Sequence, residues 1–286
     1  MNKYISIFFC VQIIALNLFA MQPKVTPVDY VRPQIDTHKS RWFFFSSASR
    51  PFGMVSLSPD TWTEGSWNSG YLYNSKEIRC FSHVHCWQLA GVPVMPTTGE
   101  VKGHKGMDAY KSTYSHETEI VKPGYHKVEL DTYQIRVELT STSRVGMHRY
   151  TYPAGEKANV LFDVGALLAH GKTEKAAIHR ISSKEIGGYS VLAPTSRRKK
   201  PVTVYFVARF NQNMTAFGGW EKEGKEKKLV HKNSIEGADI GGYASFGKLK
   251  KQTLLMKVGI SYVSEEQARI NLEKELAHWN FDRVKE

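Results

Sequence analysis

The chain has 286 residues, of which 41% are hydrophobic, 12% aromatic and 23% charged. Such a chain can bury enough apolar surface to offset the entropy of ordering, which excludes intrinsic disorder. With 22 glycines, 11 prolines and 3 cysteines it is neither collagen-like nor a disulfide scaffold. The length allows one or two domains, including a single large all-β domain.

The first 20 residues are typical of a secretory signal peptide. Lys3 precedes an apolar run over residues 5–19, and Ala20 offers a small-residue cleavage site. The run is shorter than the roughly 20 residues that a membrane span requires, and no later segment is apolar enough to span. We therefore expect a secreted or periplasmic protein with no membrane span after signal removal. A retained membrane anchor is the alternative.

A net charge of +12 raises the question of an anionic partner such as nucleic acid. The positive charge is concentrated at residues 197–200 and 222–232, and the second stretch mixes lysines with glutamates. We predict that both stretches are solvated loops between strands, because charge runs usually face water. With the predicted export, this leads us to expect no nucleic-acid partner.

Two cysteines, Cys80 and Cys86, remain once Cys10 leaves with the signal peptide. On a single strand they would lie roughly 20 Å apart. That distance is too long for a disulfide, so we expect both to be free thiols.

Alternation of apolar and polar residues dominates the chain from about residue 40 to residue 262. It is clearest over residues 125–140, which we predict to be a hairpin with a turn at Asp131 and Thr132 and one buried face. Further strands are predicted at residues 54–58, 78–87, 147–152, 159–164, 178–182, 189–193, 203–210, 243–246 and 254–262. Many short strands without alternating helices predict an all-β fold, an antiparallel β-sandwich over residues 21–262.

One helix is predicted at the C-terminal end, within residues 263–286. Ser264 followed by Gln267 three residues later forms a capping box. An apolar stripe of helical spacing follows, made of Ala268, Leu272, Leu276 and Trp279. This stripe either folds back onto the sandwich or packs against a partner, in which case it would be exposed.

The most unusual segment is residues 79–87, which holds two histidines between aromatic residues. On one strand, Phe81, His83, His85 and Trp87 would share one face, opposite Cys80, Ser82, Val84 and Cys86. Imidazoles between aromatic rings are suited to hydrogen bonding a polyol while the rings stack on a sugar. The alternatives are histidines buried against backbone groups, and a zinc site of Cys80, His83, His85 and Cys86, whose spacing does not match structural zinc sites.

A second candidate is the loop over residues 60–71, which is rich in Gly, Ser and Asn. It carries Trp62 and Trp67, and Tyr71 and Tyr73 follow. Tryptophans on loops can act as platforms for sugars, although they also cap the ends of sandwiches.

Carboxylates near predicted turns are the candidates for a hydrolytic pair, namely Asp60, Glu64, Glu117, Glu119 and Asp163. A glycosidase needs two carboxyl groups at a defined separation, one acid and one base or nucleophile. None of these five lies in a spacing that demands such a role, and carboxylates at turns usually cap backbone N–H groups. We therefore predict no catalytic residue and no metal ligand in this chain.

Several segments, taken in order, resemble one family. They are Pro51-Phe-Gly-Met-Val-Ser-Leu-Ser-Pro-Asp-Thr61, Ser69-Gly-Tyr71, Phe81-Ser-His-Val-His85, Met95-Pro-Thr-Thr-Gly99, Tyr114-Ser-His-Glu117, Pro123-Gly-Tyr125 and Glu138-Leu-Thr-Ser-Thr-Ser-Arg-Val-Gly146. The set is similar to the N-terminal domain of glycoside hydrolase family 92, the calcium-dependent exo-acting α-mannosidases. The resemblance covers nearly the whole mature chain.

This resemblance implies a supersandwich-like domain followed by an (α/α) barrel that carries the general acid, the general base and most of the calcium shell. Residues 263–286 would then be the linker helix toward a barrel that is absent here. Calcium is expected only for the complete enzyme, and α-mannoside glycans and a separate barrel chain or domain are the expected partners. The resemblance transfers Trp67, which would stack on a mannose ring, and His83 and His85, which would line or brace the junction.

Three functional hypotheses remain. The chain is the non-catalytic N-terminal half of an inverting α-mannosidase, a stand-alone carbohydrate-binding protein, or a structural sandwich without a role in sugar binding. Since fold does not decide function, the position of the C-terminal apolar stripe is the feature that would separate the first two.

Overall fold

The computed structural model describes residues 25–38, 48–63, 70–86, 89–166, 168 and 172–286. The chain forms two units, residues 1–31 and residues 32–286. In the first unit the described part holds a short 3-10 helix, η1 (Pro27–Tyr30), where the Asp29 carboxylate accepts from the Thr26 backbone N–H at 2.7 Å. The predicted signal peptide lies outside the described residues.

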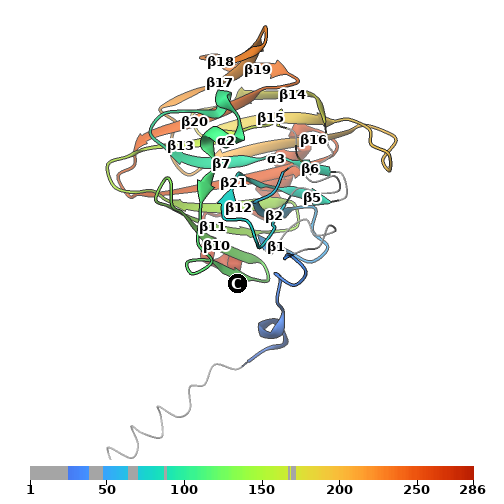
Figure 1. Cartoon of the computed structure of the whole chain (residues 1–286), viewed down its shortest axis with the longest axis vertical. Helices are drawn as coiled ribbons and strands as arrows, with labels where there is room; N and C mark the ends of the chain where they lie inside the picture. Colours follow the sequence, from blue (N-terminus) through green and yellow to red (C-terminus); the bar gives the residue numbers. More distant parts are fainter. Residues whose placement is uncertain (1–24, 39–47, 64–69, 87–88, 167, 169–171) are drawn as a thin grey trace, which may run out of the picture. The chain divides into compact units, whose positions relative to one another are not determined.

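The second unit is a sandwich of two large antiparallel sheets (Figure 1). One sheet has the order β1-β2-β4-β7-β13-β20-β17-β18. Its strands are β1 (Ala48–Ser49), β2 (Ser56–Asp60), β4 (Cys80–Ser82), β7 (Val94–Thr98), β13 (Lys157–Phe162), β20 (Gly241–Lys248), β17 (Ala216–Glu223) and β18 (Glu226–Val230). The sequence-based prediction of an antiparallel β-sandwich is confirmed.

The other sheet has nine strands in the order β19-β14-β15-β16-β21-β12-β11-β10-β9. They are β19 (Ser234–Gly237), β14 (Thr173–Arg180), β15 (Glu185–Leu192), β16 (Val202–Phe210), β21 (Thr253–Ser261), β12 (Val145–Thr151), β11 (Ile135–Ser141), β10 (Tyr125–Leu130) and β9 (Ile120–Lys122). Two small sheets pair β3 (Glu77–Ile78) with β8 (Ser112–Thr113) and β5 (Val84–Cys86) with β6 (Leu89–Gly91).

The hairpin of β10 and β11 shows how alternation builds these sheets. Its apolar residues, including Val128, Val137 and Leu139, are fully buried, while Glu129 and Arg136 lie opposite one another and form an ion pair. The chain reverses over residues 131–134 with Gln134 in the left-handed region. The predicted hairpin is confirmed.

The main core lies between the two large sheets. Phe162 of β13 stacks on Phe206 of β16 with ring centroids 6.0 Å apart, and Phe210 packs on Phe246 at 4.8 Å. Each pair joins one sheet to the other, so the two apolar faces are buried against each other.

The predicted C-terminal helix is α3 (Glu265–Glu275), and it folds back onto the nine-stranded sheet. The Ser264 hydroxyl caps it by accepting from the Gln267 backbone N–H at 3.0 Å. Leu272 and Leu276 are buried in a second apolar cluster on the outer face of that sheet. Of the two outcomes weighed from the sequence, the stripe is therefore buried and not exposed.

Beyond α3 the chain forms a second short helix, α4 (Phe281–Lys285), so the predicted stripe does not stay on one helix. Trp279 lies between the two helices, and the Lys257 ammonium lies 3.9 Å from the centroid of its ring. The same ammonium donates to the Leu276 carbonyl at 2.8 Å. A lysine of β21 thus holds the C-terminal end of α3.

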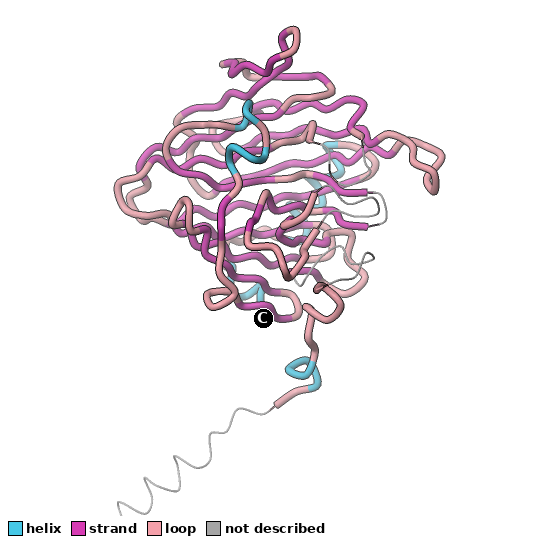
Figure 2. Tube along the Cα trace, in the orientation of Figure 1, coloured by secondary structure: helices cyan, strands magenta, loops and turns pink. Residues whose placement is uncertain are grey.

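Two other segments differ from the predictions. Residues 222–232 are mostly strand, because β17 and β18 form a tight hairpin, whereas residues 197–200 are a loop as predicted. Two short helices, η2 (Gly103–Lys105) and α2 (Met107–Tyr110), follow β7 and have no helical period long enough to detect. Figure 2 shows how few segments of the sandwich are helical. In the described ranges, no helix is long and apolar enough to cross a membrane.

We expect Leu272→Ala to destabilise the protein by about 2–5 kcal/mol, since the fully buried side chain would leave a cavity beneath α3. Leu229→Ala on edge strand β18, where the side chain is 37% exposed, is the control and should cost about 0.5 kcal/mol or less. Urea unfolding followed by circular dichroism measures both. If both variants lost the same free energy of unfolding, the result would contradict the docking of α3 onto the sheet.

Candidate functional site

The histidine segment is broken at His83 and does not run as the single strand that was predicted. β4 ends at Ser82 in the eight-stranded sheet, and β5 begins at Val84 and pairs with β6. The bend at His83 shifts the alternation, so Phe81 and Val84, predicted on opposite faces, both join the main core. The prediction of one shared face was therefore wrong.

His83 is fully buried between the two large sheets. Its Nδ1 lies 2.7 Å from the Val92 carbonyl, and its Nε2 lies 2.8 Å from Nε2 of His148 on β12. Since a carbonyl only accepts, Nδ1 carries the proton, and His148 donates to the bare Nε2. The Tyr150 hydroxyl, 2.8 Å from His148 Nδ1, completes the chain by donating.

Burial keeps this chain of rings uncharged. Desolvation lowers the pKa of His83 to about 4 and lowers the pKa of His148 well below its usual value. Two neutral imidazoles satisfy the geometry, because each ring offers one donor and one acceptor. The accepting carbonyl belongs to Val92, which lies in the left-handed region with a φ of 53°. The contact thus supports a strained backbone position.

His85 belongs to a different buried contact. Its Nδ1 lies 2.7 Å from the Ser56 carbonyl and its Nε2 lies 2.9 Å from Oδ1 of Asp60. Both side chains of the His85–Asp60 pair are fully buried. Burial by itself would lower the pKa of His85, but the Asp60 charge and the hydrogen bonds outweigh it and raise this pKa above its usual value. The contact with Asp60 therefore favours the protonated form of the His85 imidazole.

Cys80 meets the same carboxylate, with its thiol 3.4 Å from Oδ2 of Asp60. The sequence placed the thiol and the imidazole on opposite faces, and that prediction was wrong because the bend at His83 reverses the phase. Burial raises the pKa of Cys80, so the thiol is protonated. Cys80 is a free cysteine, as predicted. Trp87 and the side chain of Cys86 lie outside the described residues.

The tryptophan loop is described at its two ends. Trp67 lies within residues 64–69, outside the described residues, so its predicted contact with a sugar stays a prediction. Trp62 is 43% exposed and forms an antiparallel bridge with Gly70, which closes the loop. Tyr73 is also exposed, whereas Tyr71 is buried.

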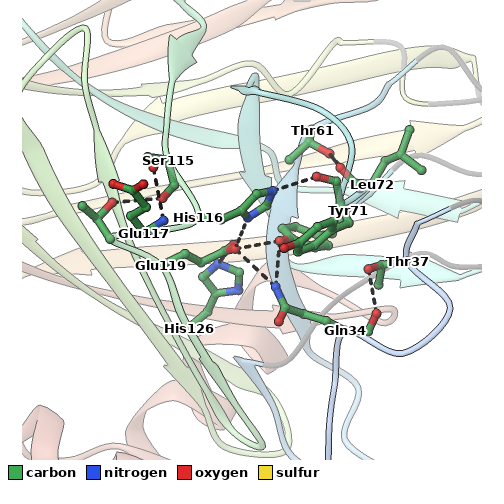
Figure 3. A network of polar contacts seen from close by, with 12 residues as sticks. Gln34, Thr37, Thr61, Tyr71, Leu72, Ser115, His116, Glu117, Glu119 and His126 are labelled. Carbon is green, nitrogen blue, oxygen red and sulfur yellow. Dashed lines mark hydrogen bonds and ion pairs between the residues drawn. The ribbon is translucent and has the colours of Figure 1, made fainter.

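Glu119 lies at the centre of a polar network beside this loop (Figure 3). Its Oε2 accepts from the Tyr71 hydroxyl at 2.8 Å and from Gln34 Nε2 at 3.3 Å, and lies 2.6 Å from His116 Nδ1. Its Oε1 lies 3.0 Å from His126 Nε2. Burial raises the pKa of Glu119, but the contacts with both histidines and Tyr71 outweigh burial, and the net shift is downward. Glu119 is thus held as a carboxylate.

The sequence named Glu119 only as a carboxylate near a turn and missed this network. Its partners lie between 3 and 85 residues away along the chain. The string Tyr114-Ser-His-Glu117 was the one local signal in this region.

Asp163 is the other buried carboxylate that stands out. Tyr110 donates to its Oδ2 at 2.7 Å, and no described residue hydrogen bonds its Oδ1. Burial raises the pKa of Asp163 to about 6. Among the described residues, no group of three or more His, Cys, Asp or Glu side chains could hold a metal ion.

We expect Asp163→Asn to stabilise the protein above pH 6. The folded state holds the aspartate proton up to about pH 6 and the unfolded state only to about pH 3.8, so stability falls as pH rises between these values. Asparagine keeps an acceptor for Tyr110 and cannot ionise. Thermal unfolding should show a gain of about 3 kcal/mol at pH 7.5 that largely disappears near pH 4. A gain that is the same at both pH values would contradict this assignment.

Gly146 should not tolerate a side chain, because an added Cβ would lie 2.7 Å from His83 Cδ2. We expect Gly146→Ala to cost about 1–3 kcal/mol. His83→Ala removes the ring that the methyl group meets, so the double variant should lose less than the two single variants together. Urea unfolding of the four proteins measures this coupling, and strict additivity would argue against the contact.

The comparisons with known proteins agree with this architecture. The model of the glycosyl hydrolase family 92 N-terminal domain matches residues 30–261. A family GH92 alpha-mannosidase, BT3965, from Bacteroides thetaiotaomicron is 27% identical, with a TM-score of 0.76 over 93% of this chain and 37% of its own. The family GH92 inverting mannosidase BT2199 from Bacteroides thetaiotaomicron VPI-5482 shares the fold, with 22% identity and a TM-score of 0.75 over 93% of this chain and 35% of its own. No curated protein sequence matches.

The chain therefore spans 35–37% of the length of these solved mannosidases. The family match covers most of the chain and runs from the segment before β1 to the last strand of the sandwich. This chain belongs to glycosyl hydrolase family 92 and represents the N-terminal domain of that family.

Proposed function

We propose that the chain is the non-catalytic N-terminal part of an α-mannosidase and forms one wall of a site for terminal α-linked mannose. The observation that carries this proposal is the family match over residues 30–261, combined with a coverage of only 35–37% of the solved mannosidases. The rest of such an enzyme, a helical barrel, would supply the acid and base of an inverting hydrolysis. Export to the periplasm or the medium is part of the same proposal.

The tryptophan loop with the residues that follow it, residues 60–73, is called the aromatic loop from here on. It is the proposed contact with the sugar. Trp67 would stack its ring on a mannose, and the exposed rings of Trp62 and Tyr73 at the ends of the loop support an aromatic surface there. His83 and His85 would not touch the sugar, since both imidazoles are buried and hydrogen bonded to protein groups. Their part in the site is bracing, which the resemblance allowed beside direct contact.

The state of three of the five candidate carboxylates supports an acid and a base outside this chain; Glu117 is exposed, and Glu64 lies outside the described residues. Asp60 is engaged by His85 and Cys80, and Glu119 by four side chains. Asp163 is buried and bonded to Tyr110. A general acid and a base that activates water both need access to the substrate or to solvent.

Calcium belongs, in this proposal, to the complete enzyme. The described residues offer no set of three acidic, histidine or cysteine side chains for it. No step of the reaction is assigned to calcium through this chain.

A stand-alone carbohydrate-binding protein is the second candidate. The observation that favours it is the burial of Leu272 and Leu276, the apolar side chains of α3 and its C-cap. The sandwich itself covers the apolar face of its C-terminal helix. A sandwich that is closed in this way can fold without a second domain.

We expect the purified chain to release no 4-nitrophenol from 4-nitrophenyl α-mannoside, with or without calcium, and a family 92 barrel domain added in trans to be required for turnover. In that mixture Trp67→Ala should raise KM about fivefold, which corresponds to roughly 1 kcal/mol of stacking. Tyr262→Ala, which removes an exposed ring next to β21, is the control and should leave KM unchanged. Calcium-dependent turnover by the chain alone would overturn the proposal, and mannoside binding without any turnover in the mixture would favour the second candidate.

A further inference from the structure

The segment from Gly70 to Tyr73 forms the second arm of the aromatic loop, and it is anchored from outside the loop. The two arms are tied to each other first. The Trp62 and Gly70 backbones exchange hydrogen bonds of 3.1 and 2.9 Å. The Thr61 hydroxyl accepts from the Leu72 N–H at 2.7 Å and donates to the Leu72 carbonyl at 3.1 Å. A displacement of one arm therefore moves the other.

Glu119 holds this second arm at two points. The first is direct, because its Oε2 accepts from the Tyr71 hydroxyl at 2.8 Å. The second runs through His116, whose Nδ1 lies 2.6 Å from Oε2 and whose Nε2 donates to the Tyr73 carbonyl at 2.8 Å. The His116 ring also stacks on the Tyr73 ring, with centroids 4.0 Å apart and planes 8° apart. Figure 3 shows Tyr71 and His116 converging on this carboxylate.

The anchor is itself fixed to the rest of the molecule. The Glu119 side chain is 2% exposed, and His126 of β10, which faces its Oε1, is fully buried. Gln34 Nε2 donates both to Tyr71 at 3.0 Å and to Glu119 at 3.3 Å, which ties in the segment before β1. A carboxylate that accepts several short hydrogen bonds in a low-dielectric setting holds its partners tightly.

We propose that Glu119 is a positioning residue, which holds the arm of residues 70–73 against the β9–β10 hairpin and so sets where Trp62 and Tyr73 present their rings. It acts through Tyr71 and His116 and does not touch the sugar. The proposal rests on the proposed function for the meaning of that position, but the anchoring itself is measurable without any sugar.

Amide hydrogen exchange of the whole chain tests the anchoring. The reporters are the N–H groups of Trp62, Gly70 and Leu72, which are protected by the hydrogen bonds between the arms. We expect Tyr71→Phe to accelerate their exchange roughly tenfold, since it removes one hydrogen bond to a charged group. Glu119→Ala should accelerate it further, and Glu119→Gln, which keeps an acceptor oxygen for Tyr71, should fall between the wild type and Glu119→Ala.

The matched control is Tyr125→Phe. Tyr125 is buried like Tyr71 and donates to another carboxylate, Glu138, at 2.7 Å, but it lies beside α4 and not beside the loop. Its loss should leave exchange at the three reporters unchanged. If Tyr71→Phe and Glu119→Gln both exchange like the wild type there, or if Tyr125→Phe accelerates the reporters equally, Glu119 is not a positioning residue.

A second readout links the anchor to the sugar. In the mixture with the barrel domain, Tyr71→Phe should raise KM for 4-nitrophenyl α-mannoside about threefold or more with little change in kcat, because only binding geometry is disturbed. A change in kcat alone would overturn the positioning role. If the mixture shows no turnover at all, the proposed function fails, and the exchange data still decide whether Glu119 anchors the loop.

Discussion

The burial of one sheet face against the other is the constraint on which the rest of this structure depends. Each strand places alternate side chains on its two faces, so the rings of Phe162 and Phe206 can meet inside only if the next residues point outward. Helix α3 packs on the outer face of the nine-stranded sheet, where its Leu272 side chain is buried. Apolar packing between the two sheets and beneath α3 thus provides the frame of the molecule.

Two buried polar contacts inside the frame are made between side chains. His83 and His148 meet as neutral rings, whereas His85 and Asp60 form a fully buried hydrogen-bonded pair. Buried polar groups are costly unless they find partners, and each of these contacts has one suitable arrangement of donors and acceptors. Their presence is therefore weak evidence of added net stability.

Buried hydrogen bonds between side chains also support the proposed function. An enzyme wall that positions substrate needs rings and backbone held within a fraction of an ångström, and buried second contacts are the usual means. Asp60, which meets His85 and Cys80, lies directly before the aromatic loop, and Glu119 holds the arm that follows it. Both ends of the loop are thus held to the sandwich by carboxylates, as the proposed positioning role requires.

Local pattern was sufficient for much of the fold. Alternation located the hairpin of residues 125–140 and most of the long strands, and the Ser264 cap located the start of α3, because these features depend on neighbours within a few residues. The motif strings in their order were sufficient for the family. The place of the C-terminal stripe was left open, since the same amphipathic helix can cover its own sheet or a partner.

What alternation could not predict was the bend at His83. A single residue there reverses the phase of the strand, brings Cys80 and His85 to one carboxylate and turns both histidines inward. The network around Glu119 was equally hidden, because Gln34, Tyr71 and His126 are far apart along the chain. The sequence by itself determined which residues are apolar and roughly where most of the long strands and the C-terminal helix lie. Only the tertiary structure decided which polar side chains meet, because that depends on how distant segments pack and not on local period.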